Sequence, residues 1–177
     1  MASSDRLFSS LMLAGSAASA APQAYAAEAE TSRQLSPGDQ SPRAHYLRDR
    51  TMSHRDWLLA NEERRRLQER WASYFGDMDV LITPAAPTAA VPDQANVPMS
   101  ERHITVDGQR RAYWEQTTWL NLAGLVHLPA ATVPLGRTRE GLPLGIQLIG
   151  AHLGDRTVIK VAGLLGELRD AQTVVLA

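Results

Sequence analysis

A short apolar run that ends at a proline places the strongest constraint on how this chain can fold. The run covers residues 79–83 (DVLIT), with Gly76 before it and Pro84 after it. A run of this length and composition is typical of a buried strand covered by helices. Four prolines then exclude a regular element from the following segment: Pro84, Pro87, Pro92 and Pro98. The sequence predicts a strand that leads into a rigid loop, at the edge where open α/β sheets tend to bind ligands.

Helical and extended patterns alternate on both sides of this loop. Ser53 is a candidate N-cap, and apolar residues recur at helical spacings over residues 54–75. Asp107-Gly108 lies between two β-prone runs and is a strong hairpin signal. The remaining patterns predict a helix over 114–126, strands over 130–135 and 144–149 joined by a loop at 136–141, and a helix over 155–168. This order of elements indicates an α/β fold.

The first fifty residues are less well specified and form a separate segment, 1–50, ahead of a main domain at 51–177. We expect an alanine-rich helix over 5–14 and a loose connector as far as Pro42, with residues 36–50 forming a loop because of their Ser-Pro strings. The run 11–21 and the string Ala-Tyr-Ala at 24–26 also resemble a weak secretory signal. A cytoplasmic location is the expectation, and export is the alternative.

Composition excludes several classes of protein. The chain has 177 residues, of which 44% are hydrophobic and 21% charged, with a net charge of −1 and no cysteine. Its one dense basic run, 64–66, is flanked by glutamates, so we expect no nucleic-acid partner. No stretch reaches the roughly 18–20 apolar residues of a membrane span, so we expect no membrane partner. Length and composition fit one ordinary globular domain.

No motif for nucleotide or metal chemistry stands in a fitting context. His54-Arg55-Asp56 and Asn61 match the spacing of a kinase catalytic loop, but they lie in a predicted helix and lack the accompanying glycine-rich loop. The five histidines show no metal-ligand spacing: His45, His54, His103, His127 and His152. We therefore expect no metal and no cofactor.

Three strings in order carry a family resemblance: DVLITPAAP at 79–87, NLAGLVHLPAATVPLG at 121–136 and GLPLGIQLIG at 141–150. Together they resemble the C-terminal part of the amidase signature family, and the resemblance covers about residues 48–168. It implies the C-terminal portion of an α/β/α fold, a mixed sheet flanked by helices, which would be incomplete in this chain.

The resemblance also implies a chemistry that this chain does not carry by itself. Members of the family hydrolyse carboxylic amides with a serine nucleophile, a second serine in a cis peptide and a lysine. None of the three can be placed here, since the one lysine, Lys160, follows the strands, whereas the family's lysine precedes both serines. We expect no catalytic residue in the chain, no turnover by it alone, and a small amide as substrate only if the missing part is supplied.

Five residues are expected to help form the wall of the acyl pocket: Pro84, Pro87, Trp114, Thr118 and Trp119. The alternative for the two tryptophans is core packing, which is the usual role of large aromatic side chains. A second hypothesis for the whole chain is a non-catalytic remnant or interaction protein. It would associate with itself or a partner through an open sheet edge.

Overall fold

The structure is a computed structural model that describes residues 2–99 and 101–175, with side-chain environments for 4–99 and 101–170. The chain divides into two compact units, and the division falls inside helix α4 (His54–Tyr74). We call residues up to Leu67 the N-terminal unit and residues from Gln68 the sheet unit. Within the described ranges, no helix has the length and apolar character needed to cross a bilayer.

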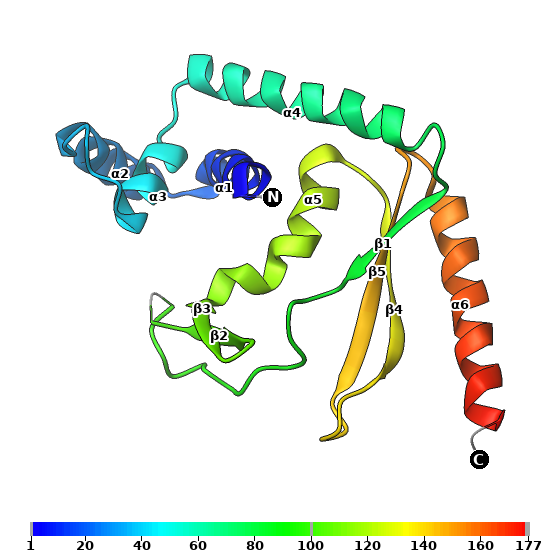
Figure 1. The fold of residues 1–177 in the computed structure, drawn as a ribbon. Helices are drawn as coiled ribbons and strands as arrows, with labels where there is room; N and C mark the ends of the chain where they lie inside the picture. Colours follow the sequence, from blue (N-terminus) through cyan, green and yellow to red (C-terminus); the bar gives the residue numbers. More distant parts are fainter. Residues whose placement is uncertain (1, 100, 176–177) are drawn as a thin grey trace. The chain divides into compact units, whose positions relative to one another are not determined.

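The N-terminal unit is helical (Figure 1). It contains α1 (Ala2–Ser16), a short 3-10 turn η1 (Ala17–Ser19), α2 (Pro22–Gln34), α3 (Pro42–Arg50) and the first part of α4. Helix α3 packs against α1, and the apolar side chains buried in this unit are few: Leu7, Ala44 and Leu47.

The expected connector and loop of this unit are wrong, because both segments contain helices. Pro22 and Pro42 each lie in the first turn of a helix, where a missing N–H costs nothing and the fixed φ favours helix. Ser41 caps α3 by accepting a hydrogen bond from Ala44 N at 3.2 Å. The Ser-Pro string that favours a turn is therefore a helix start here.

Two ion pairs connect segments of the N-terminal unit that are distant in sequence. Arg6 donates from both terminal nitrogens to the carboxylate of Asp49, whose side chain is only 4% exposed. Hydrogen bonding to Asp49 raises the pKa of the Arg6 guanidinium. Arg50 donates from Nε to Glu28 Oε2 at 2.7 Å, and this bond raises the pKa of Arg50. Both arginines therefore remain charged, and the pairs hold α3 to α1 and α2.

The sheet unit contains the elements that the sequence predicts for an α/β fold. Strands β1 (Val80–Pro84), β4 (Ala130–Arg137) and β5 (Pro143–Gly150) form a sheet in the order β1-β5-β4. The α/β class is confirmed, and both pairings between these strands are antiparallel. The rule that ligands bind at the carboxyl ends of parallel strands therefore gives no support for a ligand site at the end of β1.

Helix α6 (Asp155–Val175) covers one face of the sheet, and Figure 1 shows it running beside β4. Val133, Leu148 and Val158 form the buried cluster between them. Gly150 lies in the same contact, where an added Cβ would come within 2.4 Å of Val158 Cγ2. Side chains alternate between the faces of a strand, so Gln147 and Ile149 point to the opposite face.

Strand β1 is less buried than the sequence predicts. Thr83 is its one buried residue, while Ile82 is 52% exposed. Among the described strands, β1 pairs only with β5, and α6 contacts β4 and β5. Ile82 therefore has partners on one side only, although its pairing with Leu148 places it on the face that α6 covers elsewhere.

The predicted hairpin and the helix after it are confirmed. Strands β2 (His103–Val106) and β3 (Gln109–Ala112) are joined by Asp107 and Gly108, which both have positive φ, at 51° and 75°. The helical segment begins as a 3-10 turn, η2 (Tyr113–Thr117), and continues as α5 (Thr118–Val126). His127 ends it in the left-handed conformation, with Leu128 N bonded to Ala123 O at 3.0 Å.

Candidate functional site

The five residues predicted for the pocket wall lie on four parts of the sheet unit. Pro84 ends β1 and is exposed, and Pro87 is half-buried in the segment 85–99, which we call the proline loop. Thr118 and Trp119 are half-buried at the start of α5. Trp114 lies in η2 and is 61% exposed, so it does not pack into the core of this structure.

A buried side-chain amide joins two of these parts. Gln147, on the central strand, is 2% exposed. Its Nε2 donates to Trp119 O at 3.0 Å and to Thr83 Oγ1 at 3.4 Å. A polar group buried this deeply requires partners, so its two contacts fix the end of β1 beside the start of α5. The structure thus brings Pro84 and Trp119 to the same region.

A cavity of about 260 Å³ lies next to these residues. None of the five predicted residues is among those that line it, although Pro84 and Pro87 are next in the chain to lining residues. Its lining comes from the proline loop, η2 and the start of β5: Ala85, Ala86, Thr88, Ala89, Ala90, Val91, Gln116, Pro143, Leu144 and Gly145. Small side chains dominate this wall, and the Gln116 amide gives it a polar group that can hydrogen-bond a ligand.

Close packing on β5 sets the shape of this wall. Ala85 N donates to Gly145 O at 3.3 Å, which continues the contact between β1 and β5 into the loop. A Cβ at Gly145 would lie 3.2 Å from Thr132 Cγ2 and 3.3 Å from Val133 O. A larger residue at position 145 would therefore displace its neighbours beside the cavity.

Three residues of this region, Gln116, Gly145 and Gln147, are not among those predicted from the sequence. A signal existed for Gln147, because it is the one polar residue in the apolar run 144–149 and a buried amide requires a partner. Gln116 carries no comparable signal, since its place beside the cavity depends on how η2 packs.

The far part of the proline loop is fixed to the hairpin by side-chain hydrogen bonds. The Gln94 amide acts like a strand peptide toward His103: Nε2 donates to His103 O at 2.9 Å, and Oε1 accepts from His103 N at 3.0 Å. Arg102 donates to Val97 O at 2.8 Å and to Ala95 O at 3.1 Å. The loop is held by at least four such bonds.

The remaining candidates for chemistry have structural surroundings. Lys160 is exposed on α6. Ser53 accepts from Asp56 N at 3.1 Å as a cap of α4, and Ser73 donates to Glu69 O within that helix. The kinase-like string lies in α4, as the sequence predicts. In the described part of the chain, no group of three His, Asp or Glu side chains could hold a metal ion.

Comparisons with known proteins identify the fold and the family. The family model described as Amidase matches residues 13–159. One relative, from the glutamyl-tRNA(Gln) amidotransferase of Parvibaculum lavamentivorans, is 36% identical over 116 residues, which is 64% of this chain and 21% of that protein. Fatty acid amide hydrolase of Arabidopsis thaliana is 34% identical over 122 residues, 67% of this chain and 19% of the enzyme. The chain spans about a fifth of the length of these two relatives.

Solved structures give the same result at the level of the fold. A crystal structure of an amidase superposes with a TM-score of 0.57 at 24% identity, covering 80% of this chain and 33% of that one. The structure of 6-aminohexanoate cyclic dimer hydrolase gives a TM-score of 0.56 at 17% identity, covering 81% and 32%. Both correspond to about a third of the larger protein.

Proposed function

The chain belongs to the amidase family, and we propose that it forms part of the wall of an amide-binding pocket in the C-terminal part of an amidase domain. The wall would consist of the start of the proline loop, with Pro84 and Pro87, and of the helical segment with Trp114, Thr118 and Trp119. Amide hydrolysis is the chemistry of the family. We assign to this chain the binding and positioning of the amide substrate, and not the cleavage of its bond.

The buried Gln147 amide is the observation that carries this proposal. By bonding to both Trp119 O and Thr83, it couples the helix to the strand from which the proline loop departs. Pocket walls must be held within fractions of an ångström to position a reacting carbonyl, and satisfied buried hydrogen bonds supply such rigidity. The adjoining cavity of about 260 Å³, with small apolar side chains and the Gln116 amide, would suit a small acyl group.

Under this proposal, bond cleavage depends on groups that the described residues do not bring together. Attack on an amide carbonyl requires an activated hydroxyl with a base beside it. Lys160 is exposed on α6, Ser53 caps α4 and Ser73 bonds within it. Under this proposal, residues from the rest of an amidase domain would supply the serines and the lysine, and a small carboxamide would be the substrate.

A two-arm experiment tests the proposal. The purified chain is incubated with short aliphatic and aryl amides, and we expect no release of ammonia or amine above buffer. In the second arm, residues 51–168 replace the corresponding segment of the Arabidopsis thaliana enzyme. We expect the chimera to hydrolyse amides with an altered preference for acyl chain length. Turnover by the chain alone, or a folded chimera with unchanged preference, would contradict the proposed division of roles.

An observation on β1 favours the second candidate, association through a sheet edge. Among the described strands, β1 has a neighbour on one side only, and Ile82 on it is 52% exposed. Such an edge offers unpaired backbone groups to another strand. If this is the function, light scattering should detect an oligomer that Ile82→Lys dissociates. A monomer at all concentrations would exclude self-association through this edge.

We also propose a cytoplasmic location, without a nucleic-acid or membrane partner. The net charge of −1 gives no overall attraction to a phosphate backbone, and the one dense basic run, 64–66, is flanked by glutamates. Fractionation of the source cells with an antibody against the chain tests this location, and recovery from the medium would favour the export alternative.

A further inference from the structure

A larger cavity, of about 600 Å³, lies between the proline loop and the β2–β3 hairpin. It shares the segment 88–91 with the smaller cavity described above. One part of its wall is apolar and comes from the loop: Ala89, Ala90, Val91, Pro92 and Val97. The other part comes from the hairpin and from Glu101, two residues before it, and includes His103, Ile104, Thr105 and Arg110. The cavity therefore has an apolar side and a side with hydrogen-bond donors.

The hairpin register places His103 and Arg110 on the same face. His103 pairs with Ala112 and Thr105 pairs with Arg110, so His103 and Arg110 are diagonal neighbours across the two strands. Arg110 Nη2 donates to Glu101 O at 3.3 Å. Glu101 lies two residues before His103, so this bond places the guanidinium near the start of β2, and both Arg110 and His103 line the cavity.

The imidazole of His103 has an unusual environment. Its Nδ1 is buried and has no hydrogen-bond partner. Buried N–H groups without partners are rarer than buried acceptors without partners, so we place a ring proton on Nε2 and not on the buried Nδ1. His103 is only partly buried and lines the cavity, so the edge that carries Nε2–H is the polar part of the ring that can face it.

From this juxtaposition we infer that the cavity binds a carboxylate with a short aliphatic tail. One carboxylate oxygen accepts from the Arg110 guanidinium and the other from His103 Nε2–H, while the tail lies against the apolar side of the proline loop. A planar guanidinium suits a carboxylate better than it suits a neutral hydroxyl, because the bonds are charge-assisted. This carboxylate site is formed by the hairpin and the proline loop alone, and it is additional to the proposed pocket wall.

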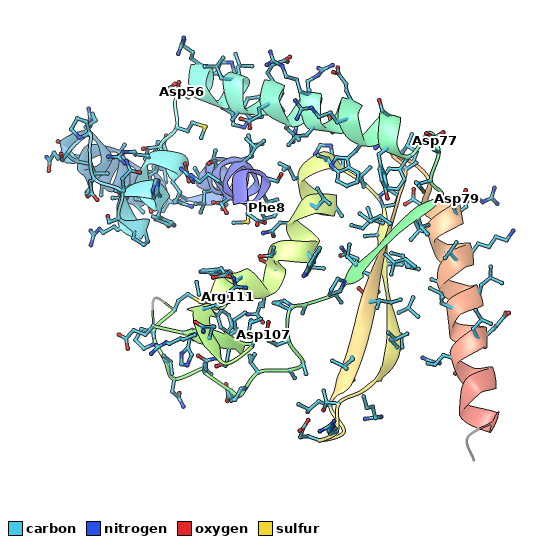
Figure 2. All side chains as sticks on the ribbon, in the orientation of Figure 1. Phe8, Asp56, Asp77, Asp79, Asp107 and Arg111 are labelled. Carbon is cyan, nitrogen blue, oxygen red and sulfur yellow. The ribbon has the colours of Figure 1, made fainter. Side chains whose placement is uncertain are left out.

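Two neighbouring charges provide internal controls. Arg111 pairs with Ile104, which places it on the opposite face of the hairpin, and its Nε lies 3.3 Å from Glu115 Oε2. Figure 2 labels Arg111 and the turn residue Asp107 on this hairpin. Arg111→Met removes the same charge as Arg110→Met from a residue that does not line the cavity, although its pair partner Ile104 does. Glu101 lines the cavity and is exposed, so Glu101→Gln removes a carboxylate that repels the ligand.

The test is a titration of the isotope-labelled full chain with sodium hexanoate, followed by NMR shifts of backbone amides in residues 88–97 and 103–112. 1-Hexanol, which has the same tail without the charge, is the comparison ligand. We expect hexanoate to bind and Arg110→Met to weaken it about tenfold, the usual effect of losing one charge-assisted contact. His103→Phe should also weaken it, whereas Arg111→Met should change it by no more than about twofold because of screening.

Several results would overturn the inference. They are the absence of hexanoate-dependent shifts in these segments, equal affinity for 1-hexanol, and equal effects of Arg110→Met and Arg111→Met. Should Arg110→Met fail to fold, Glu101→Gln decides the matter, since tighter binding supports the site and unchanged or weaker binding contradicts it. The readout is binding and not hydrolysis, so its failure is distinct from failure of the proposed function.

Discussion

The two units of this molecule are stabilised by different kinds of contact. The N-terminal unit buries few apolar side chains and depends on helix caps and on the pair between Arg6 and the buried Asp49. The sheet unit buries a larger apolar set, centred on Leu148 and Val158, and a single polar amide at Gln147. Polar contacts thus contribute a larger share of the stabilisation in the helical unit, and apolar packing a larger share in the sheet unit. Perturbations of each kind should therefore act unequally on the two units.

Removal of core volume from the sheet unit should have the largest effect. Leu148 is fully buried between Val133 and Val158, so Leu148→Ala should lower the free energy of unfolding by about 3 kcal/mol. Urea denaturation measures the loss, and amide hydrogen exchange should locate it in the sheet unit. Leu144→Ala on the same strand is the control, because its side chain is 39% exposed. A similar loss in both variants would contradict the assigned core.

Removal of a polar partner should be the most damaging kind of change in the N-terminal unit. Arg6→Met leaves the Asp49 carboxylate buried and unpaired, and we expect a loss of about 1–3 kcal/mol. This loss of unfolding free energy is smaller than for a fully buried ion pair, because the Arg6 side chain is 46% exposed. Arg33→Met, which removes an exposed pair with Glu30, should cost less than about 0.5 kcal/mol. Hydrogen exchange in α1 and α3 would measure the first loss and exchange in α2 the second, and equal effects would refute the distinction.

The helix cap at Ser41 should contribute less. Ser41→Ala removes the acceptor for Ala44 N at the start of α3, and we expect a loss of about 1 kcal/mol. Exchange rates of the first-turn amides of α3 provide the measurement. Ser41→Asp, which restores an acceptor, should recover most of the loss. A cap-deleted variant with unchanged exchange would show that packing alone forms this helix.

The smallest effect should be one of pH, at Asp39. Its carboxylate accepts a hydrogen bond from Ser41 N at 2.8 Å, and this bond lowers the pKa of Asp39. A lowered folded-state pKa stabilises the fold above the unfolded value of about 4, and the contribution disappears as the pH falls through the folded value. An NMR titration of the Asp39 carboxyl carbon should give a midpoint below that of an unfolded peptide. A midpoint at or above the peptide value would contradict this contact.

Most of the sheet unit follows from its sequence because each element carries its own signal. Residues 79–83, 130–135 and 144–149 are short apolar runs bounded by Gly or Pro, and each contributes to a strand. Asp107-Gly108 specifies its hairpin, since both residues tolerate positive φ. These local signals specify the strands and the hairpin without information about contacts between distant residues.

The helices α2 and α3 could not be predicted in this way, because their signals are ambiguous. Ser-Pro at 41–42 favours a turn as much as a helix start, and the choice depends on burial of Ala44 and Leu47 against α1. The site was predictable only in part. The proline loop and the start of α5 were expected at one place, whereas the contribution of Gln116 and the contacts of Gln147 depend on distances between elements.

The contact between Gly150 and Val158 has a consequence for how these two positions can vary. Because a Cβ at 150 would overlap Val158 Cγ2, any side chain there requires a smaller residue at 158. In a library that randomises both codons, the surviving clones should keep glycine at 150, or combine alanine at 150 with alanine or glycine at 158. Position 150 on the strand and position 158 on the helix would then covary, because the residue at each limits the substitutions accepted at the other.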